Sequence, residues 1–82
     1  MEKREVIVGD LTGKHDNPIG ELVQLACRYP GEISLLSDGH RISAKSIMGV
    51  IAFNPAPGRT ITVEAEESDA LDAMEEFLLC EA

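Results

Sequence analysis

Two side chains in this sequence are suited to carrying a phosphoryl group. His15 lies in the segment 12–18, three residues before Pro18, and Ser46 opens the short apolar run 46–50. We expect a helix to begin at both places. The first turn of a helix has unpaired backbone N–H groups and the positive end of the helix dipole, so it stabilises an anion attached nearby. Two such positions in one short chain indicate a carrier of phosphate.

The residues after His15 affect how well its imidazole would accept and transfer a phosphoryl group. A neutral imidazole is an available nucleophile near neutral pH, since the reference pKa of histidine is about 6.5. Phosphoryl transfer depends largely on positioning and on positive charge beside the phosphate. Asn17 brings no charge, and the carboxylate of Asp16 would repel a phosphate ~4 Å away by about 1 kcal/mol in water, which Lys14 offsets in part. Asp16 and Asn17 are equally well explained as helix caps, and both interpretations predict a weakened carrier.

Ser46 has an ordinary role available as the N-cap of its helix, a position that serine often takes. Phosphorylation there would add a charge of about −1.5 to −2 at the helix start and change the surface that partners meet. Ile47, Met48 and Ile51 would project beside it as a docking patch. Packing into the core is the alternative, which we expect for Val50 and consider for Ile51.

Hydrophobic periodicity predicts the elements that must position these residues. Strands are expected at 5–8, 33–36, 41–43 and 60–65, with Asp38 and Gly39 as a two-residue hairpin turn. Helices are expected from Pro18 to a stop at 30–31, from Ser46 to residue 53, and from Ser68 or Asp69 onward. The inward-facing residues of the last helix should be Leu71, Met74, Phe77 and Leu78. The order βαββαβα predicts an α+β fold with helices on one face of a four-stranded antiparallel sheet.

These residues carry a family resemblance. The Gly-X-His-X-X-Pro pattern at 13–18, the block 45–50 and the spacing between them resemble HPr, the histidine phosphocarrier of the bacterial sugar phosphotransferase system, and its regulatory relative Crh. The similarity runs without a gap over nearly the whole chain and implies the open-faced β-sandwich of that family. Asn17 replaces the arginine that the family has two residues after the histidine. The chain falls between the two relatives, because Crh lacks the phosphorylatable histidine that this chain keeps as His15.

The resemblance also implies partners. It implies that His15 receives its phosphoryl group from the phosphoenolpyruvate-dependent Enzyme I and passes it to IIA domains. It implies that Ser46 is the target of an ATP-dependent serine kinase/phosphorylase, and that the phosphoserine form is a corepressor for the catabolite regulator CcpA. We assign the neighbourhood of the phosphate on His15 to Asp16, Asn17 and Pro18. The expected partner-binding residues are Gly20, Gln24, Ile47, Met48 and Ile51.

Length and composition set further bounds. A chain of 82 residues has room for one core, so we expect a single domain over 1–82. It has no apolar run of the roughly 20 residues that cross a bilayer and no signal-peptide pattern, which predicts a cytoplasmic protein without membrane insertion. Cys27 and Cys80 are expected to be unpaired thiols, with a disulfide as the alternative. With His15 and a solvated His40 they form no recognisable ligand spacing, so we expect no metal and no cofactor.

The distribution of charge disfavours nucleic acid as a direct partner. The net charge is −8, the acidic residues gather from Glu64 onward, and the last basic residue is Arg59. A small RNA-binding α+β domain is the alternative from another class, but such domains stack bases on strand aromatics. No aromatic residue of this chain lies in an expected strand; they are Tyr29, Phe53 and Phe77.

We therefore predict an HPr-like phosphocarrier and regulatory protein that is phosphorylated at His15 and at Ser46. No second catalytic group can be placed beside His15 from the sequence, so a carrier is favoured over an independent enzyme. The alternative is a Crh-like regulator that acts through phosphorylated Ser46 as a protein-binding cofactor for carbon catabolite repression and transfers no phosphoryl group.

Overall fold

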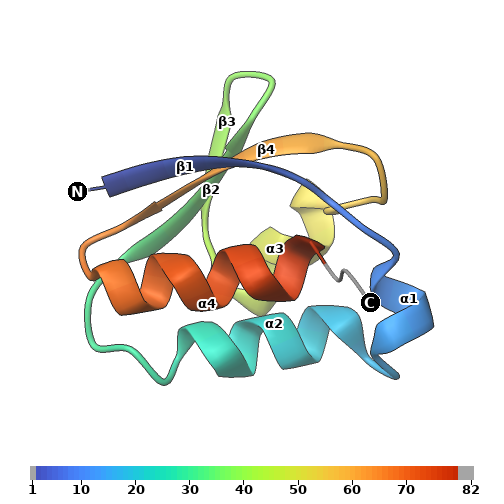
Figure 1. Cartoon of the computed structure of the whole chain (residues 1–82), viewed down its shortest axis with the longest axis horizontal. Helices are drawn as coiled ribbons and strands as arrows, with labels where there is room; N and C mark the ends of the chain where they lie inside the picture. Colours follow the sequence, from blue (N-terminus) through green and yellow to red (C-terminus); the bar gives the residue numbers. More distant parts are fainter. Residues whose placement is uncertain (1, 80–82) are drawn as a thin grey trace.

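A four-stranded antiparallel sheet with helices over one face is the framework of the protein (Figure 1). The computed structural model describes residues 2–79, apart from the side chain of Lys14. In chain order the elements are β1 Glu2–Ile7, α1 Leu11–Lys14, α2 Pro18–Ala26, β2 Ile33–Ser37, β3 His40–Ser43, α3 Ile47–Phe53, β4 Thr60–Ala65 and α4 Ser68–Leu79. The predicted α+β fold is confirmed, with one helical turn, α1, added where a loop was expected.

The sheet is built around β4, which pairs with β1 on one side and with β2 on the other, giving the order β1-β4-β2-β3. Ile61 and Val63 of β4 are fully buried, as expected for the face that the helices cover. The pairing of Glu2 with Ala65 brings the first residues of the chain into β1, whereas the sequence predicted a strand at 5–8. The hydrophobic pattern missed this start because the residues there are charged and β1 is an edge strand.

The turn between β2 and β3 has the predicted form. Asp38 has φ 52° and Gly39 has φ 80°. Positive φ at both central positions makes a type I′ turn, whose twist matches that of the flanking strands. The turn fixes the register of this hairpin, in which Ser37 pairs with His40.

The core lies between the sheet and the pair formed by α2 and α4 (Figure 1). Leu22 of α2 and Leu71, Met74 and Leu78 of α4 are fully or almost fully buried at helical spacing. Each such side chain contributes about 1.5–3 kcal/mol to stability by leaving water. Phe77, also predicted to face inward, is only partly buried. Within residues 2–79, no helix combines the length and the apolar character needed to cross a membrane.

Backbone hydrogen bonds tie the segment between β1 and α2 to the rest of the fold. The N–H of Val8 donates to the carbonyl of Arg59 at 2.9 Å, and the N–H of Gly9 donates to the carbonyl of Leu78 at 2.8 Å. The second bond joins this segment to the last turn of α4. The backbone that leads to His15 is thereby held against that helix.

Candidate functional site

His15 lies at the junction of two helices. The side chain of Asp10 caps α1 by accepting from the N–H of Gly13 at 3.1 Å, and the N–H of His15 donates to the carbonyl of Leu11 at 2.9 Å to close that turn. Asn17 then caps α2, its side-chain oxygen accepting from the N–H of Gly20 at 3.4 Å. Of the two N-caps considered for α2, the structure has Asn17. His15 itself lies just before this helix, at the C-cap of α1.

The imidazole of His15 is less exposed than a loop residue was expected to be. Its Nδ1 lies 2.9 Å from Oε1 of Glu21. Its ring stacks on the ring of Phe77, with 4.1 Å between ring centroids and 16° between the planes. The side chain keeps 21% of its surface exposed. A carboxylate and an aromatic face therefore fix the ring, while part of it still faces solvent.

Glu21 joins His15 to the start of α2. Its second carboxylate oxygen, Oε2, accepts from the backbone N–H of Asn17 at 3.0 Å. That bond lowers the pKa of the Glu21 carboxyl below its usual value, and the contact with His15 lowers it further. The sequence analysis missed Glu21. Its spacing of one helical turn from Asn17 was a signal that its carboxylate could reach the N-terminus of α2.

A shallow hollow of about 310 Å³ opens beside the ring. It is lined by His15, Glu21, Gln24, Leu25, Arg28 and Phe77. Gln24, a predicted partner-binding residue, thus lies near His15. Asp16 and Asn17 are exposed, whereas Pro18 and Gly20 are partly buried in the first turn of α2. Arg28 and Phe77 were not predicted here, because their approach to His15 depends on the tertiary fold.

Ser46 has the position that the sequence predicts. It is the exposed N-cap of α3, with extended φ −98° and ψ 110°, and its Oγ accepts from the N–H of Gly49 at 3.1 Å. Its carbonyl accepts from the N–H of Val50 at 2.9 Å. A group attached to Oγ would therefore lie at the first turn of α3 and extend into solvent.

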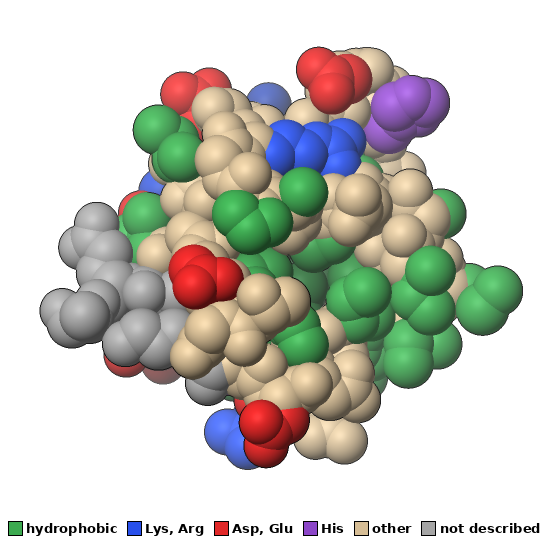
Figure 2. Space-filling model, turned by 90° about the vertical axis from the view of Figure 1, so that its right-hand side faces the viewer, with side chains coloured by type: hydrophobic (Ala, Val, Ile, Leu, Met, Phe, Trp, Pro, Cys, Tyr) green, Lys and Arg blue, Asp and Glu red, His purple; other side chains and the backbone are tan. Residues whose placement is uncertain are grey.

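The exposed face of α3 is apolar. Ile47 is 49% exposed, Met48 73% and Ile51 51%, while Val50 is fully buried. The expectation of core packing is confirmed for Val50, whereas Ile51, for which core packing was the alternative, lies at the surface. Val50 and Phe53, three residues apart, form the buried side of this short helix, and Ile51 points elsewhere. Figure 2 shows hydrophobic side chains gathered toward the right-hand edge of that view of the surface.

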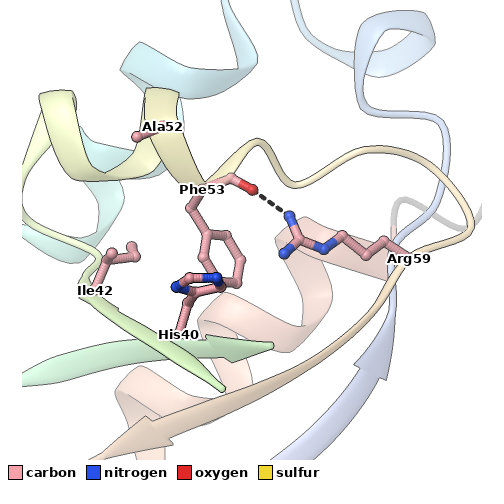
Figure 3. Close-up of a pocket in the computed structure, with 5 residues that line it drawn as sticks. All are labelled: His40, Ile42, Ala52, Phe53 and Arg59. Atoms are coloured by element: carbon pink, nitrogen blue, oxygen red, sulfur yellow. Dashed lines mark hydrogen bonds between the residues drawn. The ribbon is translucent and has the colours of Figure 1, made fainter. Parts of the chain in front are cut away.

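His40 lies at a second hollow, of about 260 Å³, lined by His40, Ile42, Ala52, Phe53 and Arg59 (Figure 3). It is exposed, as predicted. The guanidinium of Arg59 lies 4.4 Å from the centre of the Phe53 ring and donates to the carbonyls of Phe53 and Asn54. Nη1 of Arg59 therefore caps the last carbonyls of α3.

The expectations about cysteines and metals concern residues that the structure describes only in part. Cys27 is a free, exposed thiol, and Cys80 lies outside the described residues. Among residues 2–79, no three histidine, cysteine, aspartate or glutamate side chains come together as a metal site would require.

Comparison with known proteins agrees with this geometry. Residues 2–79 match the family PTS-HPr, described as "PTS HPr component phosphorylation site". The crystal structure of the phosphocarrier protein HPr from Bacillus anthracis str. Ames is 30% identical with a TM-score of 0.85, over 94% of this chain and 95% of that one. HPr-C-His from Thermoanaerobacter tengcongensis is 27% identical with a TM-score of 0.85, over 95% of this chain and 91% of that one. Crh from Bacillus subtilis is 26% identical with a TM-score of 0.71, over 89% of this chain and 83% of that one. The chain belongs to the HPr family of phosphotransferase-system components.

Proposed function

We propose that this protein is an HPr-type phosphocarrier that accepts a phosphoryl group on His15 and is regulated by phosphorylation of Ser46. The observation that supports the proposal is the position of His15 just before the N-cap of α2, in a chain that matches the HPr family over residues 2–79. A phosphoryl group on this ring would lie near the positive end of the α2 dipole, which favours negative charge. The ring retains exposed surface through which a donor protein can reach it.

Donor and acceptor proteins follow from the family's chemistry. Enzyme I would supply the phosphoryl group and IIA domains would receive it. Gln24 beside the ring and Gly20 in the first turn of α2 are candidate contacts. The exposed residues of α3 extend this surface, because α2 and α3 pack against each other; they are Ile47, Met48 and Ile51. A net charge of −8 makes a nucleic acid an unsuitable direct partner.

The carrier would be a slow one. The side chain of Asn17 caps α2 and supplies no positive charge. The exposed Asp16, next to His15 in the sequence, adds a negative charge. In an electrostatically assisted transfer, the loss of one well-placed donor lowers the rate by about 10²–10³. We expect transfer through His15 to be impaired by a factor in this range without being abolished.

A second candidate is a Crh-like regulator in which phosphorylated Ser46 is the working signal. It is favoured by the exposed cap at Ser46 and the exposed apolar residues that follow it. A serine kinase/phosphorylase would add the phosphate, and a CcpA-like regulator would bind the product. In this function the protein acts by docking alone, and His15 transfers nothing.

Two labelling reactions distinguish these functions. The protein is incubated with Enzyme I and phosphoenolpyruvate, or with the serine kinase and ATP, alongside His15→Ala and Ser46→Ala variants. Acid-labile label that disappears only in His15→Ala supports the carrier. Acid-stable label alone, lost only in Ser46→Ala, supports the regulator. Absence of both labels, with an authentic HPr as a positive control, would leave neither function standing.

A further inference from the structure

The ring of Phe77 lies face to face with the imidazole of His15. The two ring centroids are 4.1 Å apart, and the planes are within 16° of parallel. Phe77 belongs to α4, where Met74 and Leu78 are fully buried, but Phe77 itself is only partly buried and lines the hollow beside the imidazole. An aromatic face from the last helix therefore covers one side of the ring that would carry the phosphoryl group.

Separate contacts hold the two stacked rings in place. The buried Leu78 anchors the end of α4, and its carbonyl accepts from the N–H of Gly9 at 2.8 Å, in the segment that leads to His15. On the other side, Oε1 of Glu21 lies 2.9 Å from Nδ1 of the imidazole. Because each ring is held independently, we expect the stack to persist when a group is attached to the imidazole.

Accepting a phosphoryl group changes the charge of the stacked imidazole. The lone pair of one ring nitrogen forms a bond to phosphorus, and the bond between phosphorus and the leaving atom of the donor breaks, its electron pair departing with the donor. The other ring nitrogen keeps its proton, so the ring becomes a cation. The face of a phenyl ring is the negative part of its quadrupole, and it attracts a cation within about 6 Å of the ring centroid.

We propose that Phe77 stabilises the phosphorylated form of His15 by presenting its aromatic face to the cationic ring. The proposal rests on the proposed function, since it needs His15 to accept a phosphoryl group. The stack acts on the charge of the imidazole and not on the charge of the phosphate. It is therefore independent of the positive charge that Asn17 does not supply beside the phosphate.

Apolar packing of Phe77 is the alternative, and fluorination of the ring separates the two. Fluorine atoms withdraw electron density from the face of a phenyl ring and change its shape little, so they remove the attraction for a cation and leave apolar packing in place. The variant is the full-length protein in which Phe77 is replaced with pentafluorophenylalanine. A purely structural role predicts that its phosphorylated form is as stable as that of the wild type.

The stability of the phosphorylated form is measured as a partition. The protein is mixed with authentic HPr, a limited supply of phosphoryl groups and a catalytic amount of Enzyme I, and the share of label on each carrier is read at equilibrium. Enzyme I is a catalyst here, so its affinity for a variant alters the rate and not the final partition. We expect fluorination of Phe77 to shift the partition away from this protein by about 2–5-fold.

The second aromatic ring that contacts a cation supplies the matched control. Phe53 lies 4.4 Å from the guanidinium of Arg59, and the same fluorinated replacement there should leave the partition unchanged. Phe77→Tyr keeps an electron-rich face and should stay close to the wild type. Thermal unfolding of each variant checks that α4 keeps its fold. An unchanged partition for fluorinated Phe77, or an equal shift for fluorinated Phe53, would overturn the proposal.

A small donor tests the stack without Enzyme I. Phosphoramidate transfers its phosphoryl group to histidine directly, and NMR separates the ring signals of His15 from those of the exposed His40. Fluorination of Phe77 should slow labelling of His15 and leave His40 unaffected, and equal effects at both would contradict the proposal. If phosphoramidate labels His15 and Enzyme I does not, the carrier function fails, and this ratio of rates still decides the role of Phe77. A His15 that neither donor labels contradicts both.

Discussion

Residue 17 caps α2 and also lies close in sequence to His15, so its side chain affects both the helix and the charge near the imidazole. Asn17 caps α2 with its side chain and holds Glu21 with its backbone N–H, so it adds no positive charge near His15. The basic residue that lines the hollow beside the ring is Arg28, which follows the other end of α2. Arg28 brings positive charge to this hollow from beyond the end of α2. We expect charge at position 17, next to the start of α2, to control the rate of transfer.

Asn17→Arg is expected to raise the rate of labelling by Enzyme I and phosphoenolpyruvate by up to about 10²–10³, because it restores a cation beside the phosphate. Asn17→Asp is the matched control, since aspartate caps a helix as well as asparagine but adds negative charge. It should slow the reaction. Initial rates of acid-labile labelling measure both effects. Equal rates for the two variants would show that charge at this position does not limit transfer.

At the scale of the element, α3 combines a cap and a docking face in a very short helix. Ser46 satisfies the N–H of Gly49, and the buried side of the helix consists of Val50 and Phe53. The remaining large residues, Ile47, Met48 and Ile51, stay at the surface. Stability and recognition are therefore assigned to different residues of the same helix and can be changed separately.

Ser46→Ala is expected to lower the free energy of unfolding by about 0.5–2 kcal/mol, because the N–H of Gly49 loses its side-chain acceptor. Ser46→Asp should stay close to the wild type, since aspartate caps as well as serine and suits the helix dipole. Urea denaturation followed by circular dichroism measures both variants. A Ser46→Ala protein as stable as the wild type would show that the cap contributes little.

Met48→Ala is expected to change the free energy of unfolding by less than about 0.5 kcal/mol, because the side chain is 73% exposed. It should weaken binding to Enzyme I, measured by calorimetric titration. Val50→Ala is the opposite case. It opens a cavity under α3, and its cost in stability should be about 2 kcal/mol. Unchanged affinity in Met48→Ala would remove this residue from the proposed docking surface.

Features that depend on neighbouring residues were predicted from the sequence, and features that depend on distant residues were not. The turn at Asp38 and Gly39 and the cap at Ser46 depend on neighbouring residues, and both were predicted correctly. The one-turn helix α1 was missed because four residues containing Gly13 show no helical periodicity. The stack of Phe77 on His15 brings together opposite ends of the chain, which local patterns do not record. The fold was therefore accessible to sequence reasoning, but the surroundings of the imidazole, which include Glu21 and Phe77, were not.

At the scale of the whole molecule, an acidic chain keeps one carboxylate nearly buried on its sheet. Glu64 is 5% exposed, and its Oε1 accepts from Nη1 of Arg41 at 2.8 Å. Lys3 lies 3.8 Å from its other oxygen. The Arg41 hydrogen bond lowers the pKa of Glu64 below its ordinary value of 4.5, and Lys3 adds a smaller effect of the same sign. Three strands, β1, β3 and β4, meet through this carboxylate.

The pH dependence of stability follows from this sign. The pKa of Glu64 is lower in the folded protein than in the unfolded chain. At a pH between these two pKa values, the unfolded chain binds more protons than the folded protein. The free energy of unfolding therefore falls as the pH drops below about 4.5. Glu64→Gln should flatten this part of the curve and lower stability at neutral pH. Glu5→Gln, at an exposed position of β1, should do neither. Urea midpoints between pH 7 and pH 3 measure all three proteins. Parallel curves for wild type and Glu64→Gln would contradict this assignment.

The contact between His15 and Phe77 joins two residues that are made far apart in time during synthesis. Phe77 belongs to the final helix and emerges from the ribosome after almost all of the chain, whereas Ser46 and Gly49 emerge together. The contacts of the serine cap are local in sequence, whereas the imidazole has its stacking partner only once α4 has been made. A chain cut before α4 would keep the residues that form the Ser46 cap but would lose the ring that stacks on His15.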